Sequence, residues 1–265
     1  MKTILITGST DGIGKLAALK LAEDEHQILI HGRDSKKVES AISEIKDHTD
    51  TEKISGFISD LSDFESIKKM ISDLSKSISK IDVLINNAGV FKSSVPLNKE
   101  GLDVRFAVNY FAPYLLTNGL LPLLKKSDSA RVINLSSAAQ SPVSLTALLG
   151  QCQKSDQEAY AQSKLALTMW SFDFAKKYPE ITTIPVNPGS LLNTKMVQEA
   201  YGQHWSSADK GATILYELAV SEKFSNNNGQ YFDNDKGDFN RAHMDAYDHV
   251  KIETLIAETE KIVNG

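Results

Sequence analysis

A tyrosine and a lysine four residues apart are the side chains of this sequence best suited to chemistry. Tyr160 and Lys164 lie in a stretch of helical character, where residues i and i+4 share one face. A cation beside a phenol favours the phenolate and lowers its pKa from about 10. Tyr160 could then act as general acid or base toward a carbonyl or alcohol. The same spacing also arises from ordinary packing or a solvated pair, so other motifs must support it.

Two further polar candidates accompany apolar segments. Ser136 and Ser137 follow the apolar run Arg131–Leu135, and a hydroxyl at the carboxyl end of a parallel strand can reach a ligand crevice. There it could donate a hydrogen bond to a substrate oxygen as charge develops. We favour Ser137, which is further from the strand, with a turn-capping serine as the alternative. Asn109 interrupts an apolar helical segment, either to bind water or break the backbone ladder, or as a satisfied buried amide.

A glycine-rich turn connects the first apolar run to a helical segment. Glycine permits unusual backbone angles and close approach of a ligand, and a helix N-terminus attracts phosphate. The spacing is Gly-x3-Gly-x-Gly, and a structural turn is the alternative to a pyrophosphate site. The candidate cofactor-binding residues of this turn are Gly8, Ser9, Thr10, Asp11, Gly12, Ile13 and Gly14.

The residues after the second apolar run indicate which dinucleotide binds. His31, Gly32, Arg33 and Asp34 occupy the place where an acid would hold a ribose, or an arginine would hold a 2′-phosphate. The guanidinium of Arg33 suits phosphate, so we expect NADP(H) to be preferred, with NAD(H) as the alternative. A solvated loop arginine, or an Arg33–Asp34 ion pair, would weaken this interpretation.

Short apolar runs alternate with longer helical patterns along the chain. Near-continuous apolar runs indicate strands buried on both faces, and repeated β-α-β units require a parallel sheet with helices on both sides. We predict one α/β domain over residues 1–265, a Rossmann-type doubly wound sheet of about seven strands, followed by a C-terminal helix over about 240–263. The expected strands are Ile4–Thr7, Ile28–His31, Ile54–Ile58, Val83–Asn86, Arg131–Leu135, Thr183–Asn187 and Gln230–Phe232.

Composition excludes several classes of protein. The formal net charge of the 265 residues is -5 without a dense basic stripe, so a nucleic-acid partner is not expected. The histidines and the single cysteine, Cys152, show no metal-ligand spacing, and no metal is expected. Without an apolar leader or a run of about 18 apolar residues, we expect no membrane span and a cytoplasmic location.

Taken in order, these segments resemble the short-chain dehydrogenase/reductase family in its single-domain branch. The resemblance implies a catalytic tetrad in which Tyr160 transfers the proton, Ser137 steadies the carbonyl, Lys164 tunes the tyrosine and holds ribose, and Asn109 holds a relay water. The motifs that carry the resemblance are Thr7-Gly8-x3-Gly12-x-Gly14, Asp60-Leu61, Asn86-Asn87-Ala88-Gly89, Asn109, Ser137, Tyr160-x3-Lys164 and Pro188-Gly189.

The resemblance also assigns the remaining cofactor contacts. Asp60 and Leu61 would contact adenine, and Asn87, Ala88 and Gly89 would lie against the adenosine ribose. The nicotinamide end would be positioned by Pro188, Gly189 and Thr194. Within the family the chain is most similar to the group of retinol dehydrogenases, WW-domain oxidoreductases and protochlorophyllide reductases, on the sequence His31–Asp34, the lysine Lys15 and the long segment between Ser137 and Tyr160.

The variable stretches Ala138–Ala159 and 191–207 are expected to shape a pocket for a small carbonyl or alcohol substrate. Their apolar residues suit a hydrophobic compound, with packing onto the domain as the alternative. The leading hypothesis is an NADP(H)-dependent carbonyl reductase or alcohol dehydrogenase, and the alternative is a catalytically silent NADP(H)-sensing regulator. A homodimer is an expectation by analogy alone. The apolar residues concerned are Leu145, Leu148, Leu149, Leu191, Leu192, Met196, Tyr201 and Trp205.

Overall fold

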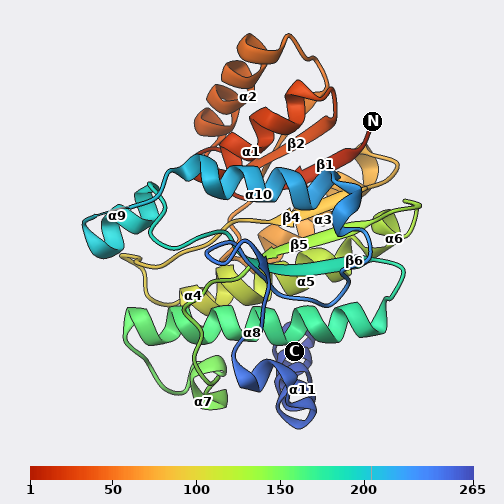
Figure 1. Cartoon of the computed structure of the whole chain (residues 1–265). Helices are drawn as coiled ribbons and strands as arrows, with labels where there is room; N and C mark the ends of the chain where they lie inside the picture. Colours follow the sequence, from red (N-terminus) through yellow and green to blue (C-terminus); the bar gives the residue numbers. More distant parts are fainter. Residues whose placement is uncertain (204) are drawn as a thin grey trace.

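The computed structural model describes residues 1–203 and 205–265, without the side chains of residues 200 and 201, and is built on one sheet (Figure 1). Its described strands follow the order β3-β2-β1-β4-β5-β6-β7-β8, parallel from β3 to β7, with β8 antiparallel to β7. The strands are β1 Thr3–Ile6, β2 Gln27–Gly32, β3 Ile54–Ile58, β4 Val83–Asn86, β5 Arg131–Leu135, β6 Thr182–Asn187, β7 Phe232–Asp233 and β8 Asp238–Phe239.

This arrangement confirms the predicted doubly wound sheet and corrects the prediction for the strands at one edge of it. Strands β1, β4 and β5 are buried along their whole length, which explains their near-continuous apolar sequence. The predicted strand Gln230–Phe232 is displaced to Phe232–Asp233, and β8 was not predicted. Strands of two residues are too short to show an alternating pattern.

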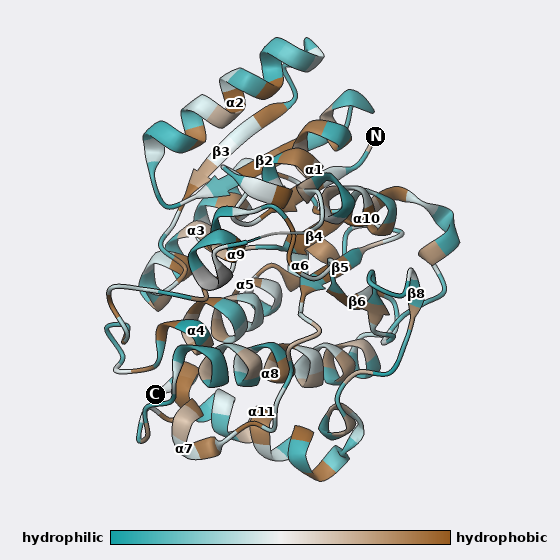
Figure 2. Cartoon of the chain, turned by 60° about the vertical axis from the view of Figure 1, so that its left-hand side comes forward, coloured by the Kyte–Doolittle hydropathy of each residue, from teal (hydrophilic) through white to brown (hydrophobic). Residues whose placement is uncertain are grey.

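Helices cover both faces of the sheet and build two cores (Figure 1). Helices α1, α2 and α10 pack on one face, and α3, α5 and α8 pack on the other. Figure 2 shows apolar strands at the centre and a largely hydrophilic helix α2. The bounds of these helices are α1 Gly12–Glu23, α2 Ser35–Thr49, α10 Ala208–Val220, α3 Phe64–Ser77, α5 Ala112–Gly119 and α8 Asp156–Lys177.

Shorter elements complete the chain. A π-helical turn, η1 (Ala107–Phe111), sits between α4 and α5, and the C-terminal segment forms two elements rather than the single predicted helix. These are the 3-10 turn η3 and helix α11, which packs on α8. The remaining bounds are α4 Val104–Phe106, α6 Leu121–Leu124, α7 Leu145–Leu148, α9 Lys195–Tyr201, η2 Glu222–Phe224, η3 Met244–Tyr247 and α11 His249–Asn264.

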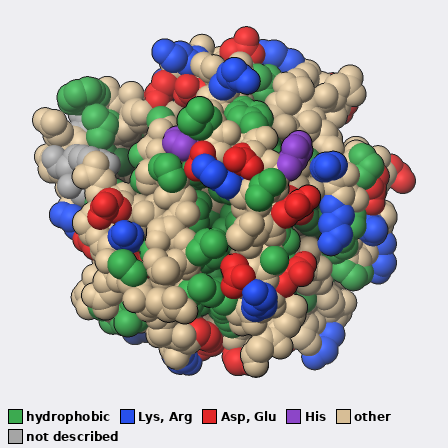
Figure 3. All heavy atoms as spheres, turned by 90° about the horizontal axis from the view of Figure 1, so that it is seen from below, with side chains coloured by type: hydrophobic (Ala, Val, Ile, Leu, Met, Phe, Trp, Pro, Cys, Tyr) green, Lys and Arg blue, Asp and Glu red, His purple; other side chains and the backbone are tan. Residues whose placement is uncertain are grey.

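The face of the molecule that lies at the bottom of Figure 1 carries both acidic and basic side chains. Figure 3 shows acidic, basic and apolar side chains interspersed across this face rather than one field of a single sign. Among its exposed apolar side chains are Met244, 78% exposed, and Val250, 72% exposed.

Candidate active site

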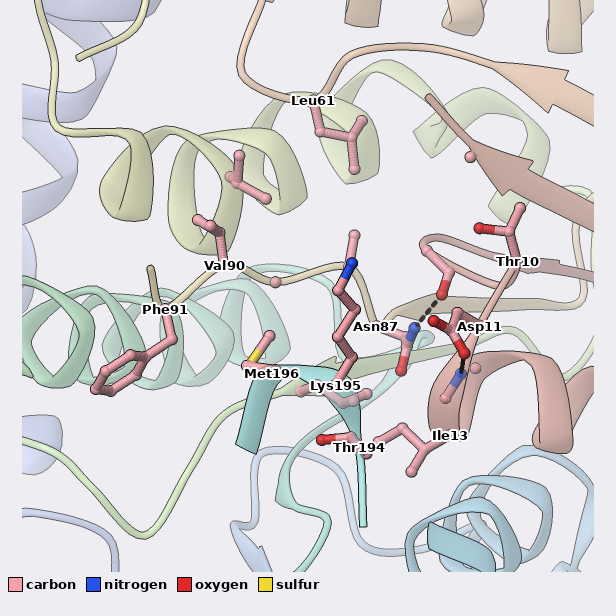
Figure 4. A pocket seen from close by; sticks show the side chains of 18 of the residues that line it. Thr10, Asp11, Ile13, Leu61, Asn87, Val90, Phe91, Thr194, Lys195 and Met196 are labelled. Atoms are coloured by element: carbon pink, nitrogen blue, oxygen red, sulfur yellow. Dashed lines mark hydrogen bonds between the residues drawn. The ribbon is translucent and has the colours of Figure 1, made fainter. Parts of the chain in front are cut away.

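A cavity of about 640 Å³ opens at the carboxyl ends of the parallel strands. This is where open α/β sheets bind ligands, because the loops after neighbouring strands converge there. Figure 4 shows Thr10, Asp11 and Asn87 toward one end of the cavity, and Val90, Phe91 and Met196 toward the other. The sequence-predicted site residues that line it are Gly8, Thr10, Asp11, Gly12, Ile13, Gly14, Arg33, Asp60, Leu61, Asn87, Ala88, Gly89, Ser137, Tyr160, Lys164, Pro188, Gly189 and Thr194.

The glycine turn is held tightly against the loop after β4. Gly8 has a φ of 63°, and a Cβ on it would lie 2.8 Å from the Cα of Ala88. Asn87 Nδ2 donates to the carbonyls of Thr7 (2.7 Å) and Gly8 (3.0 Å). A Cβ on Gly14 would lie 2.7 Å from the oxygen of Gly8 and would collide with the Asn87 amide. Only glycine permits this approach, which leaves the N-terminus of α1 at the cavity, where a helix start is suited to an anion.

Ser9 is the exception within the turn, because it does not line the cavity. Its side chain is fully buried, and its Oγ donates to the carbonyl of Ile6 (2.7 Å) and accepts from the amide of His31 (3.0 Å). The side chain of Ser9 therefore points away from the cavity, and the predicted cofactor contact of Ser9 stays a prediction for its backbone alone. The serine instead ties the turn to the end of β2.

His31 is a positioning residue that sequence reasoning missed. Its Nδ1 accepts a hydrogen bond from the Gly8 amide (3.0 Å), and its Nε2 lies 3.1 Å from the carbonyl of Ser59. These contacts require the neutral tautomer with its proton on Nε2. Burial lowers the pKa of His31 to about 4, so the ring stays neutral and keeps this orientation. The only signal in the sequence was a polar residue ending a buried strand.

The loop after β2 brings a cation to the cavity rim. Arg33 is exposed and lines the cavity, as Lys37 does. A Cβ on Gly32 would lie 2.6 Å from Cγ2 of Thr10, so the glycine lets the two loops meet. Asp34 caps α2 by accepting from the amide of Lys37 (3.1 Å).

Lys15 does not extend this cluster. It pairs with Glu44 of α2 at 2.9 Å and is not among the described residues that line the cavity.

Helix α8 presents Tyr160 and Lys164 on one face, as their spacing predicts. A capping box between Ser155 and Glu158 fixes the start of this helix. Lys164 is 3% exposed, its Nζ lies 5.6 Å from the centroid of the Tyr160 ring, and it donates to the carbonyl of Leu135 (2.6 Å). Burial lowers the pKa of Lys164 to about 7. A phenol and an ammonium thus meet at the end of β5.

The two serines after β5 have different environments. Ser136 is buried, and its Oγ lies 2.7 Å from the hydroxyl of Thr168 and 3.2 Å from the carbonyl of Lys164. Ser137 lines the cavity, and its Oγ accepts from the amide of Ala139 (3.0 Å). Both serines line the cavity, so the choice of Ser137 as the candidate stays a prediction.

Asn109 is buried behind the cavity and is not among the described lining residues. Its Oδ1 accepts from the amide of Val90 (2.8 Å), and its Nδ2 donates to the carbonyl of Val90 (3.0 Å) and to Ser163 Oγ (3.0 Å). It lies in the π-helical turn η1, consistent with the predicted interruption of the backbone ladder. Its side chain therefore acts on the cavity through the loop that carries Val90.

The apolar end of the cavity is built differently from the prediction. Within the described residues, Ala138–Ala159 contributes nothing to the lining: Leu148 of α7 is buried in the core, and Leu145 is 37% exposed. The loop after β4 lines this end of the cavity instead. The ring centroid of Phe91, in that loop, lies 4.9 Å from the ring centroid of Tyr160. Val90, Phe91 and Met196 lie at this end (Figure 4), and Val104, Val108 and Leu192 are further apolar residues that line the cavity.

The first half of the second predicted stretch, 191–207, contributes to the cavity lining. Leu192, Thr194 and Met196 line the cavity, whereas Trp205 is 76% exposed and is not among the described lining residues. The side chain of Tyr201 lies outside the described part of the chain.

Comparison with known sequences places this geometry in a family. The pattern described as "short chain dehydrogenase" matches residues 2–205. The chain belongs to the short-chain dehydrogenase family. Mouse retinol dehydrogenase 13 is 31% identical over 251 residues, which cover 88% of this chain and 75% of that protein. This relationship confirms the resemblance to the retinol dehydrogenase group, and the protein is an oxidoreductase of this family.

Solved structures of other proteins share this fold. An uncharacterised protein from Mycobacterium paratuberculosis has a TM-score of 0.80 at 23% identity, covering 100% of this chain and 94% of its own, and shows the fold. A short chain dehydrogenase from Escherichia coli CFT073 complexed with NADPH has a TM-score of 0.74 at 25% identity, covering 88% and 96%. Such neighbours support a nicotinamide cofactor for this protein. In the part of the chain that the structure describes, no helix is both long and apolar enough to cross a membrane.

Proposed function

We propose that this short-chain dehydrogenase is an NADP(H)-dependent oxidoreductase that interconverts a carbonyl compound and an alcohol, with Tyr160 as general acid and base. The observation that carries the proposal is the pairing of Tyr160 with the buried Lys164 in the cavity that also contains the glycine turn. Because β1 and β7 belong to one sheet, we also propose that residues 1–265 act as one domain.

The cavity fits a dinucleotide along its length. The close-packed Gly8 and Gly14 leave the amides at the start of α1 for the diphosphate, and Arg33 at the rim suits a 2′-phosphate. Asp60 and Leu61 would hold adenine. The remaining proposed contacts are Asn87, Ala88 and Gly89 at the ribose, Lys164 at the second ribose, and Pro188, Gly189 and Thr194 at the nicotinamide end.

The protein's own groups would supply the proton chemistry. A bound nicotinamide supplies or accepts the hydride. In the reductive direction Tyr160 gives its hydroxyl proton to the substrate oxygen, and Ser137 donates a hydrogen bond to the same oxygen. The ammonium of Lys164 favours the phenolate that remains. Asn109 positions Val90 beside this centre through its two hydrogen bonds to that backbone.

The substrate is proposed to be an apolar aldehyde, ketone or alcohol. Aliphatic and aromatic side chains line the cavity together with Tyr160, and Phe91 packs against the Tyr160 ring. Burial of an apolar substrate there would exclude water from the reacting carbonyl. The name of the mouse relative, a retinol dehydrogenase, points to the same chemical class.

Replacing Tyr160 with phenylalanine tests the proposal directly. Purified wild type and Tyr160→Phe would be incubated with NADPH and a panel of apolar and polar aldehydes and ketones. We expect turnover of apolar members to fall at least a hundredfold in the variant, because a positioned acid contributes about 10²–10⁴-fold, with NADPH affinity retained. Tyr178→Phe, a partly exposed tyrosine outside the described cavity lining, is the matched control. Cofactor binding by the wild type without turnover of any substrate would overturn the proposal.

A further inference from the structure

Asp235, in the turn between β7 and β8, is bound to the loop that follows β6. Its Oδ1 accepts from the amide of Ser190 (2.9 Å), and its Oδ2 accepts from the Ser190 hydroxyl (2.5 Å). Oδ2 also accepts from Asn187 Nδ2 (2.9 Å), and Lys210 Nζ lies 3.7 Å from Oδ1. One carboxylate thus joins three segments: the turn, the loop of Pro188 and Gly189, and the start of α10.

Asn234, the preceding residue, holds the same loop by its other side. Its Nδ2 donates to the carbonyls of Pro188 (2.8 Å) and Lys210 (3.2 Å), and its backbone amide donates to the carbonyl of Asn187 (3.0 Å). Asn187 completes the arrangement, because its Oδ1 accepts from the amide of Gly189 (3.2 Å). Both peptide ends of the loop are therefore fixed by side chains of the turn.

The residue that leads into β7 holds the second loop of the site. Tyr231 is buried, and its hydroxyl donates to the carbonyl of Ser137 (3.0 Å). Gln140 Nε2 donates to the same carbonyl (2.9 Å), and its Oε1 accepts from the amide of His243 (3.0 Å). The peptide of the candidate catalytic serine is thus anchored from the C-terminal segment.

We propose that Tyr231, Asn234 and Asp235 form a positioning clamp that fixes the Pro188–Ser190 loop relative to Ser137, and with it the nicotinamide end relative to the reacting carbonyl. This inference rests on the proposed function. The three clamp residues lie beyond residue 205, where the family match ends, whereas the loops that they hold lie within it.

Charge on Asp235 suits this role. Partial burial raises its pKa, but the hydrogen bonds from Ser190 and Asn187 and the charge of Lys210 outweigh burial, and the net pKa is lowered. The carboxylate stays ionised and accepts from all its donors at once. Hydrogen bonds to a charged group stabilise more than neutral ones, so the loop loses freedom before the cofactor arrives.

The test compares two ligands that differ in the nicotinamide half. NADPH spans the whole cavity, whereas adenosine 2′,5′-bisphosphate carries only the adenosine half. In Asp235→Asn we expect the dissociation constant of NADPH to rise about tenfold, the equivalent of one hydrogen bond to a charged group. The dissociation constant of the bisphosphate should stay unchanged, measured by calorimetry. Asp238→Asn, the same change at an exposed position of β8, should alter neither.

Two further variants test the other contacts of the clamp. Ser190→Ala removes only the hydroxyl bonded to Asp235. It should raise the dissociation constant of NADPH by a smaller factor than Asp235→Asn does. Tyr231→Phe should lower kcat several-fold with NADPH affinity unchanged, because it releases the serine peptide. Equal losses for both ligands in Asp235→Asn, or no loss for either, would overturn the clamp. If the wild type bound no NADPH at all, the proposed function itself would fail.

Discussion

At the scale of single residues, Arg33 makes the choice of cofactor testable. Arg33 is exposed and lines the cavity where the loop after β2 begins. A contact with a 2′-phosphate would stabilise only the phosphorylated cofactor. We expect Arg33→Ala to raise KM for NADPH about tenfold, the loss of one charge-assisted interaction, and to leave KM for NADH unchanged. Lys36→Ala, an exposed cation outside the described lining, is the control. An unchanged ratio of the two KM values would remove the assignment.

The buried amine of Lys164 makes the free energy of unfolding depend on pH. Burial lowers its pKa to about 7 from an ordinary value of 10.5. Between these values the unfolded chain holds a proton that the folded chain has lost, so the contribution of Lys164 to stability rises with pH from about 7 to 10.5. Below about pH 7 both states hold the proton, so the contribution stops changing with pH and the cost of burying the charge is at its largest. The slope is at most about 1.4 kcal/mol per pH unit.

Urea unfolding of the cofactor-free protein at several pH values between 7 and 10 would show this rise. In Lys164→Met the rise should be absent, because no amine is left to titrate, whereas the exposed Lys236→Met should retain it. Parallel curves for wild type and Lys164→Met would contradict the buried, proton-shedding lysine.

At the scale of elements, the glycine turn depends on space that only Gly14 leaves. A Cβ there would meet the oxygen of Gly8 and the Asn87 amide, although alanine favours a helix by about 1 kcal/mol over glycine. The clash should displace Asn87 and the turn it holds, so we expect NADPH affinity to fall at least tenfold in Gly14→Ala. Fluorescence titration of NADPH would measure it. Retained affinity with a higher midpoint of unfolding would mean that the turn simply relaxes.

The elements also show how far sequence reasoning reaches. Strands such as Val83–Asn86 were predicted with correct bounds because burial on both faces leaves a continuous apolar run. The roles of His31 and Asp235 could not be predicted, because they depend on contacts with residues distant in sequence, Gly8 and Ser190. The segment Ala138–Ala159 has the same difficulty: composition gives its apolar character, but only packing decides that Leu148 enters the core while most of the segment stays at the surface, away from the cavity lining.

At the scale of the whole molecule, the C-terminal helix α11 covers part of α8. Leu255 of α11 is 1% exposed and belongs to the same core as Trp170 of α8. The aromatic side chains of Tyr114 and Trp170 meet beneath this cover, with ring centroids 5.6 Å apart. Surface that α11 covers is not free for a partner, and the expected homodimer remains a prediction that solution mass measurement would decide.

A single buried hydrogen bond joins this cover to the π-helical turn that carries Asn109. The hydroxyls of Tyr110 and Thr259 lie 2.6 Å apart, and both side chains are fully buried. Thr259→Val keeps the shape of the side chain but leaves the phenol without its partner, so we expect a loss of about 1–3 kcal/mol in the free energy of unfolding. The exposed Thr254, whose hydroxyl also donates to the carbonyl four residues earlier, provides the matched variant Thr254→Val. Equal unfolding midpoints in urea for the two variants would show that α11 contributes through its apolar face alone.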